Sequence, residues 1–380
     1  MRCLCIIEVY DLYIFLYFYE GATMMNQFFP SYTIGADAYD AIPEICGYFG
    51  KTAVIVGGEK ARKAAEPAIR KACEGHIDII GSYLYGHNCT FENAKKISEI
   101  PDVQKADMIF AVGGGRACDT VKISAEYLKK PIFTFPTLAS NCAPVTKVCA
   151  VYHEDNSFNK VWYRSRPAFH TFINSDVILH APREYFWAGI GDALSKQYEV
   201  LFSARGDAGK DLDYLLSLGV QMAGNCSDEL LRYGVQAMKA YDEGKITEDF
   251  ERVIQLIICT TGLVSNCLVH DYNSNLGHAI YNAHTELPHD KEYLHGAVVC
   301  YGVLVLLTLD KQFKARDQMY QFCKDIDLPH KLADIGESMD TVDQLVEHAV
   351  NKPDLNKVAY PITKDMIKQA ILDLEALSEK

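Results

Sequence analysis

The chain has 380 residues, a length that predicts two domains, and its apolar (49%) and charged (23%) fractions are those of a globular protein. The formal net charge of −13 argues against nucleic acid and anionic membranes as partners, because both attract basic surfaces. The 13 cysteines include no CxxC pair, which favours reduced thiols and a cytoplasmic location.

The first residues differ from the rest of the chain. Residues 1–22 are apolar and aromatic, but Glu8, Asp11 and Glu20 interrupt them. They provide neither a charge-free run that could span a bilayer nor a signal peptide with a basic start and a small-residue cleavage site. We therefore expect residues 1–25 to be an extension outside the fold, read from an upstream start codon, and a chain that begins at Met25 to fold.

Strand and helix patterns alternate between residues 26 and 180. The predicted elements are a strand at 52–56, a helix at 59–73, extended segments at 77–80 and 82–85, a helix at 91–97, a strand at 108–112, a helix at 117–130, a strand at 131–135 and a hairpin of 147–152 with 160–163. Such alternation predicts a parallel sheet covered by helices on both faces. We interpret residues 26–180 as a Rossmann-like dinucleotide-binding domain.

The pattern becomes purely helical after residue 180. Apolar residues at helical spacing form one buried face at 250–258, and residues 362–377 resemble a final amphipathic helix. Thr341 and Gln344 have the spacing of a capping box at the start of another helix. No strand is predicted after Leu179. Residues 181–380 are therefore predicted to form an all-helical domain, which makes the fold class α/β plus all-α.

Three consecutive glycines, Gly113 to Gly115, stand between the strand at 108–112 and the helix that follows it. Glycines at such a junction let the backbone approach a ligand closely, and a helix N-terminus presents free N–H groups with partial positive charge. This combination predicts a phosphate-binding loop. A tight turn without a ligand is the alternative interpretation.

The helical half contains candidate metal ligands. Asp192 follows a glycine at the start of a helix, and His278 and His295 flank a polar loop that carries His284 and His289. Two imidazoles and one carboxylate suit a divalent ion with an open coordination position. The chain has 12 histidines, however, and ligands this far apart in sequence are not established by spacing.

Five motifs occur in the order found in one family. They are residues 110–122 (FAVGGGRACDTVK), 136–144 (PTLASNCAP), 188–194 (AGIGDAL), 277–282 (GHAIYN) and 293–296 (YLHG). The match runs from about residue 30 to the C-terminus, and the chain resembles the iron-containing alcohol dehydrogenase superfamily, most of all its glycerol dehydrogenase branch. The resemblance implies a nucleotide domain followed by a helical metal-binding domain, the fold shared with dehydroquinate synthase, with the site in the cleft between them.

The resemblance also implies roles for individual positions. The family's catalytic metal ligands correspond to Asp192, His278 and His295. Its pyrophosphate loop corresponds to Gly114, Gly115 and Arg116, with Asp119 in the following helix. Its contacts on the nicotinamide side correspond to Thr137, Ser140, Thr146, Val148 and Tyr152. NAD or NADP and one divalent ion are the implied cofactors, and we expect zinc, typical of the glycerol branch, rather than iron.

Two departures from the branch pattern concern specificity. Cys142 stands where glycerol dehydrogenases typically carry an aspartate that binds the polyol, and this cysteine resembles a sub-branch that reduces 2-oxo acids. Lys147 and Arg164 are candidates to meet a substrate carboxylate, although solvated surface charge is the commoner role. Gly57 and Gly58 replace the acidic residue of many NAD enzymes, and Lys60 could pair with a 2′-phosphate, which favours NADP(H) over NAD(H).

Several functions follow from this reading. The first is a metal-dependent NAD(P) oxidoreductase that acts on a small alcohol or polyol. The alternatives are an NADPH-dependent 2-oxo acid reductase, a dehydroquinate synthase-like lyase, which would need a basic substrate pocket, and a non-catalytic binding protein. We expect a homo-oligomer, as the family tends toward dimers and rings. Lys196, one turn after Asp192, is expected to be a structural partner of that carboxylate.

Overall fold

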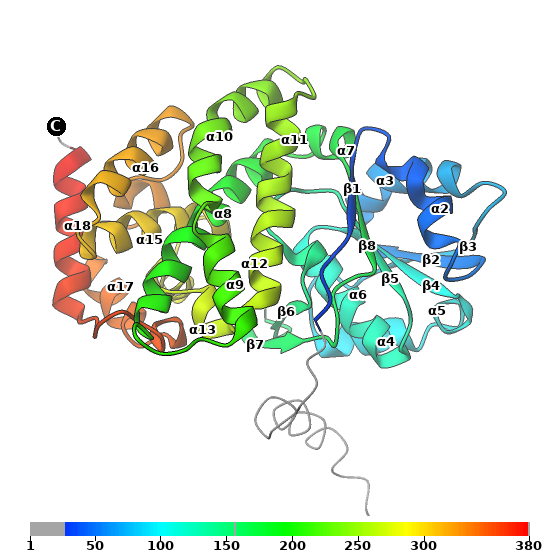
Figure 1. The fold of residues 1–380 in the computed structure, drawn as a ribbon, viewed down its shortest axis with the longest axis horizontal. Helices are drawn as coiled ribbons and strands as arrows, with labels where there is room; N and C mark the ends of the chain where they lie inside the picture. Colours follow the sequence, from blue (N-terminus) through cyan, green and yellow to red (C-terminus); the bar gives the residue numbers. More distant parts are fainter. Residues whose placement is uncertain (1–26, 156, 379–380) are drawn as a thin grey trace, which may run out of the picture.

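The computed structural model describes residues 27–155 and 157–378 of the chain. The predicted extension of residues 1–25 lies outside these described residues. A sheet with its flanking helices forms one half of the molecule, and a cluster of helices forms the other half beside it (Figure 1).

The main sheet has six parallel strands in the order β1-β8-β5-β4-β2-β3. Their bounds are β1 Tyr32–Gly35, β2 Thr52–Gly57, β3 Asp78–Leu84, β4 Met108–Gly113, β5 Ile132–Pro136 and β8 His170–Asn174. The central strands β4 and β5 are buried along their whole length, as a parallel sheet with two covered faces requires. The predicted parallel sheet is therefore confirmed.

Helices cover both faces of this sheet. They are α2 Ile42–Cys46, α3 Glu59–Cys73, α4 Phe91–Ser98, α5 Pro101–Lys105 and α6 Gly115–Leu128. One apolar cluster joins Ile69 of α3 to Phe110 and Phe133. A second joins Val121 of α6 to Ile109, the neighbour of Phe110 on β4. The side chains of adjacent residues on β4 thus pack on opposite faces of the sheet, as expected for a strand that is buried on both sides.

The structure corrects some predicted boundaries. The extended segments predicted at 77–80 and 82–85 form the single strand β3. The helix predicted at 117–130 begins at Gly115 and ends at Leu128, because Lys129 has a left-handed backbone with φ of 53°. Sequence analysis missed β1 and β8. The first is short and half-exposed, and the second contains the polar residues His170, Thr171 and Asn174.

The predicted hairpin is confirmed as the antiparallel pair β6 Val148–Tyr152 and β7 Phe158–Tyr163. After β8 the chain enters the helical half, in which no strand occurs among the described residues. Its principal helices are α7 Ser175–Leu179, α8 Arg183–Arg205, α9 Tyr214–Ala223, α10 Cys226–Asp242, α11 Glu248–Gln255, α12 Thr261–Cys267, α13 His270–Asn273, α14 Leu276–His284, α15 His295–Leu309, α16 Phe313–Asp325, α17 Val342–Ala349 and α18 Lys364–Ser378.

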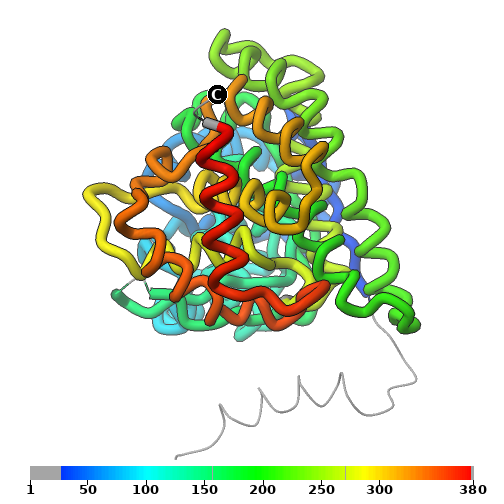
Figure 2. The backbone as a smooth tube through the Cα atoms, turned by 90° about the vertical axis from the view of Figure 1, so that its left-hand side faces the viewer, coloured from blue at the N-terminus to red at the C-terminus, as the bar shows by residue number. Residues whose placement is uncertain are grey.

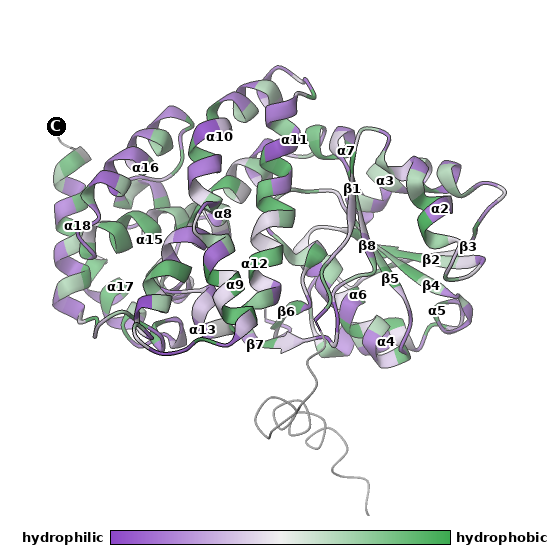
Figure 3. Cartoon of the chain, viewed as in Figure 1, coloured by the Kyte–Doolittle hydropathy of each residue, from purple (hydrophilic) through white to green (hydrophobic). Residues whose placement is uncertain are grey.

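Helix α15 is the centre of the helical half. Every residue from Gly296 to Leu309 is buried, and its apolar side chains share one core with α8, α14 and α18. Viewed from the helical end, α18 lies over this core (Figure 2). Coloured by hydropathy in the view of Figure 1, α15 is largely hydrophobic, whereas the surface helices are mixed (Figure 3). No described helix combines the length and hydropathy needed to cross a bilayer.

Two helical predictions need correction. The face predicted at 250–258 begins in α11, but residues Leu256–Thr260 form a π-helical turn before α12. Helix α17 does begin after Thr341, yet the Thr341 side chain does not cap it. The Thr341 hydroxyl is engaged by Ser338 instead, since it accepts from the backbone N–H of Ser338 and donates to the carbonyl of the same residue.

Candidate metal and nucleotide site

Glycines bring three ligand-bearing helices together. A Cβ atom on Gly191 would lie 2.5 Å from the carbonyl oxygen of Gly296, and one on Gly296 would lie 2.0 Å from that of Ala188. Helices α8 and α15 can therefore approach this closely only with glycine at both positions. Gly277 and Gly302 give α14 and α15 a similar contact, with 2.7 Å between a Cβ on Gly302 and the Cα of Gly277.

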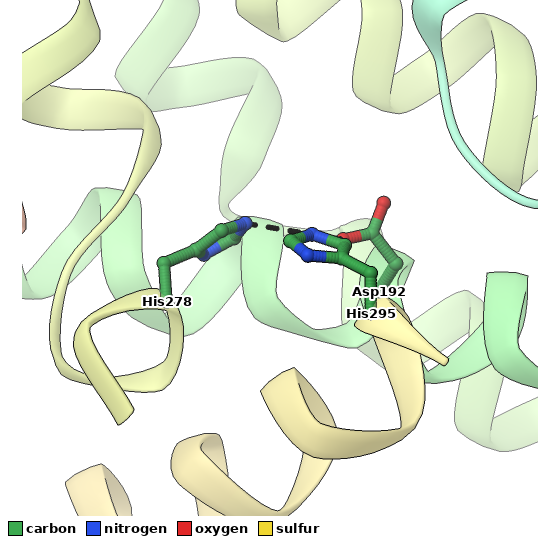
Figure 4. A group of neighbouring side chains, drawn as sticks. All are labelled: Asp192, His278 and His295. Carbon is green, nitrogen blue, oxygen red and sulfur yellow. Dashed lines mark ion pairs between the residues drawn. The ribbon is translucent and has the colours of Figure 1, made fainter. Parts of the chain in front are cut away.

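These contacts place Asp192, His278 and His295 in one group, each from a different helix (Figure 4). Asp192 Oδ1 lies 3.1 Å from Nε2 of His295 and 3.9 Å from Nε2 of His278. The two imidazoles thus turn the same nitrogen toward one carboxylate oxygen. Two nitrogens and one oxygen that converge in this way fit a divalent ion with open coordination positions.

Glu199 orients His278 from the opposite side. Its buried carboxylate accepts a hydrogen bond from His278 Nδ1 at 2.6 Å, and it also accepts from the backbone N–H groups of Asn275 and His278. This bond holds one proton on Nδ1, so a metal that binds at Nε2 displaces only the second proton of the ring. Sequence analysis missed Glu199, although its spacing of seven residues from Asp192 places both on one face of α8.

The charges of the site are strongly coupled. Burial lowers the pKa of His278, but the nearby Glu199 and Asp192 carboxylates outweigh it and raise that pKa to about 9. Burial raises the pKa of Asp192, and the hydrogen bond and charge of His295, aided by His278 and Lys196, bring it below the usual value. The carboxylate therefore stays ionised in the buried site, as metal binding requires.

The glycine loop forms the N-terminus of α6. Gly114 occupies the N-cap position without a side-chain cap, so the first N–H groups of a 14-residue helix are not used by a capping side chain. A Cβ on Gly115 would lie 2.8 Å from Asn141 Nδ2, and one on Gly114 would lie 3.0 Å from Leu138. Glycine at both positions therefore lets the loop pack against Leu138 and Asn141, and the uncapped helix N-terminus is the feature that suits a phosphate.

The other positions assigned to nucleotide binding lie around this loop. The Arg116 guanidinium lies 5.2 Å from the ring centre of Tyr152, and the Thr137 N–H donates to the carbonyl of Gly113. Ser140 is half-buried, and its Cα would lie 3.0 Å from a Cβ on Gly189 of α8. Arg116 and Tyr152 are thus brought to the end of β4 from two separate segments.

Asp119, Thr146 and Val148 surround a buried lysine. Lys122 Nζ lies 2.7 Å from Asp119 Oδ1, and it donates to the carbonyls of Ala143, Thr146 and Val148. Lys122 therefore ties helix α6 to the segment that leads into β6. Sequence analysis did not single out Lys122, whose importance depends on these distant carbonyls.

Cys142 and Lys196 both lie near Ser265 in the structure. Cys142 is half-buried, with its Sγ 3.8 Å from the Ser265 hydroxyl. Lys196 donates to Ser265 Oγ and Asn273 Oδ1, both at 3.1 Å, rather than forming the expected ion pair with Asp192. Its charge still contributes to the lowered pKa of Asp192.

The basic residues predicted to contact the substrate or the nucleotide lie in different surroundings. Arg164 is buried, ion-paired with Glu126 and bonded to the Pro167 carbonyl, so it is neither a surface charge nor available to a substrate. Lys147 is half-buried. Lys60 is exposed in the first turn of α3, next to the β2 end of the sheet. His284 and His289 lie in a separate group with Glu337.

Comparison with known proteins finds similarity to members of the same family. A family model described as iron-containing alcohol dehydrogenase matches residues 30–176. The glycerol dehydrogenase of Thermotoga maritima is 28% identical over 87% of this chain and 89% of its own. Hydroxycarboxylate dehydrogenase A of Escherichia coli is 26% identical over 85% and 89%. A probable glycerol dehydrogenase from Sinorhizobium meliloti superposes with a TM-score of 0.79 at 27% identity, covering 93% of this chain and 99% of that one.

Proposed function

This chain belongs to the iron-containing alcohol dehydrogenase superfamily, in its glycerol dehydrogenase-like branch, and we propose that it oxidises a small alcohol or polyol reversibly to the carbonyl compound. The observation that carries this proposal is the convergence of Asp192, His278 and His295 in the helical half. The glycine loop at the N-terminus of α6 supplies the second requirement, a place for a dinucleotide.

The residues divide the work between binding and orientation. When bound, a divalent ion supplies Lewis acidity to the substrate oxygen and the nicotinamide exchanges a hydride with the adjacent carbon. Asp192, His278 and His295 would hold the ion. Glu199 keeps the His278 proton on Nδ1 and so fixes the orientation of that ring. Gly114, Gly115 and Arg116 would hold the pyrophosphate, which aligns the dinucleotide with the site.

We extend the proposal to the cofactors. Zinc suits two imidazoles and one carboxylate, and we favour it over iron. The absence of an acidic residue at Gly57 and Gly58, with Lys60 exposed nearby, favours NADP(H) over NAD(H). A homo-oligomer in a reducing cytoplasm is our expectation for the assembly and its location.

A 2-oxo acid reductase is the second candidate function, and Cys142 is the observation that favours it. A thiol in place of a carboxylate removes repulsion against an anionic substrate. The relative named hydroxycarboxylate dehydrogenase A supports this alternative. We propose the polyol reaction first, because the glycerol dehydrogenase of Thermotoga maritima is 28% identical to this chain against 26% for the hydroxycarboxylate dehydrogenase, and further glycerol dehydrogenases also match.

The experiment is a rate measurement at 340 nm with NADH and with NADPH. The carbonyl panel contains dihydroxyacetone, glycolaldehyde, 2-oxobutyrate and 2-oxoglutarate, each with and without added Zn²⁺. We expect reduction of dihydroxyacetone or glycolaldehyde, and a 2-oxo acid as the best substrate would select the second candidate. Absence of turnover with every carbonyl, both nucleotides and added metal would refute both.

A further inference from the structure

A second group of metal-binding side chains lies outside the site described above. His284 ends helix α14, His289 stands in the loop between α14 and α15, and Glu337 follows a short 3-10 helix at Leu332–Ile335. One ligand atom from each of the three lies within 4.8 Å of the others. Apart from Asp192, His278 and His295, this is the one such group in residues 27–155 and 157–378.

The distances within this group match those of ligands that share an ion. Glu337 Oε1 lies 2.9 Å from Nδ1 of His284 and 3.5 Å from Nε2 of His289. Ligands about 2.0–2.1 Å from a tetrahedral ion are separated by roughly 3.3 Å. His289 Nε2 also donates a hydrogen bond of 2.8 Å to the carbonyl oxygen of His284, and an ion bound at this nitrogen would replace that bond.

The buried carboxylate has no cationic side chain beside it. The Glu337 and His284 side chains are 1% and 3% exposed, and no lysine or arginine of the described chain forms an ion pair with Glu337. Its second oxygen, Oε2, is buried without a hydrogen-bond partner among these residues. A buried carboxylate is costly unless a positive charge and further bonds compensate it.

The two imidazoles are in direct ring contact. Their centroids lie 3.7 Å apart with 26° between the planes, and the edge of Tyr293 packs against both rings. Neutral imidazole is the form that binds metals.

Gly336 allows the carboxylate to reach this position. It has a φ of 73°, in the left-handed region, and a Cβ there would lie 2.3 Å from the Tyr293 hydroxyl oxygen. Glycine is therefore required by both backbone conformation and space. The turn directs Glu337 toward the two histidines, of which His284 is 53 residues earlier in the chain.

We propose that His284, His289 and Glu337 form a second divalent-metal site. Two nitrogen donors with a carboxylate suit a borderline ion such as Zn²⁺ or Co²⁺. The ion would connect the loop between α14 and α15 to the segment before α17. This loop joins the two helices that carry His278 and His295. The site has a structural role here, because its donors are protein groups within a buried cluster.

Metal content of the full-length chain tests this proposal without reference to turnover. The protein is stripped with a chelator, dialysed against buffered Zn²⁺ and assayed for zinc per chain by mass spectrometry. We expect two equivalents for the wild type, one for His278→Ala, one for Glu337→Gln and none for the double variant. His180→Gln, at an exposed histidine outside both groups, is the matched control and should retain two.

Cobalt provides a second readout at the proposed site. With Co²⁺, the His278→Ala chain should show visible d–d absorption, and the His278→Ala/Glu337→Gln chain should not. If Glu337→Gln fails to fold, His289→Asn replaces it, since His289 lies nearer the surface. A His278→Ala chain that folds but binds neither zinc nor cobalt would overturn the proposal and leave only a hydrogen-bonded His284–Glu337 pair.

Discussion

The Nδ1 atom of His278 lies 2.6 Å from the Glu199 carboxylate, while Nε2 of the same ring faces Asp192. Asp192 and Glu199 are seven residues apart on α8, so one helix face contacts both nitrogens of an imidazole from another helix. Glu199 is thus a positioning residue, because it acts on the site through His278.

Substitution of Glu199 by glutamine should weaken metal binding at the catalytic site. The amide preserves the shape but removes the charge that holds the Nδ1 proton, and loss of such a partner typically costs about 10–100-fold in affinity. The measurement is the free Zn²⁺ concentration that half-restores turnover of stripped protein. An unchanged midpoint would show that Glu199 does not orient His278.

Substitution of Lys122 by methionine should destabilise the fold rather than alter the chemistry directly. It would leave the buried Asp119 carboxylate without its ion-pair partner and three carbonyls without a donor. Breaking a buried pair from one side costs about 3–5 kcal/mol in the free energy of unfolding. Urea denaturation measures this loss, and the double variant Asp119→Leu/Lys122→Met should recover part of it.

Substitution of Cys142 by aspartate should shift substrate preference toward neutral polyols. Two carboxylates about 5 Å apart repel by roughly 3 kcal/mol at an effective dielectric constant of about 20. We therefore expect the ratio of kcat/KM for dihydroxyacetone to that for 2-oxobutyrate to rise about a hundredfold. Cys142→Ser is the isosteric control, and equal ratios for both variants would remove Cys142 from the substrate site.

Stability should depend on pH through His170, which connects β8 to β1. Ser31 donates to the Phe169 carbonyl, so its oxygen accepts from Nδ1, and Nε2 is left to accept from Thr33. Burial lowers the pKa of this neutral imidazole to about 4. The unfolded chain, with a pKa near 6.5, binds the proton more readily.

The sign of this effect follows from the lowered pKa. The His170 contribution to stability is complete above pH 6.5 and is lost as the pH falls toward 4, by up to about 3 kcal/mol. Thermal unfolding of the wild type and of His170→Gln between pH 7 and pH 4 measures it. The variant should lose less stability than the wild type over this range, and parallel curves would contradict the assignment.

The parts of the fold that sequence predicted are those with local signals. Strand β4 is a continuous buried run, and the glycines after it mark a strand-to-helix junction. Residues such as Glu199 and Lys122 escaped prediction because their partners are distant in sequence. Glu199 binds His278, 79 residues later, and Lys122 binds carbonyls 21 to 26 residues later.

Sequence reasoning was weakest where a polar side chain has several possible partners. Lys196 is one turn from Asp192, and helical spacing favours an ion pair between them. The fold instead brings Ser265 and Asn273 to the lysine ammonium. The same holds for Thr341, whose hydroxyl binds Ser338 rather than the start of α17.

The central claim is that Asp192, His278 and His295 hold the ion on which hydride transfer depends. The most direct test measures NAD(P)H-linked turnover of chelator-stripped protein as Zn²⁺ is returned, alongside nucleotide binding by fluorescence. We predict that the wild type regains turnover and that the turnover of His278→Ala stays more than tenfold lower, a loss of more than about 1.4 kcal/mol of transition-state stabilisation. The nucleotide affinities of the two proteins should agree within about twofold. Full turnover by stripped wild-type protein, or by His278→Ala, would contradict the account.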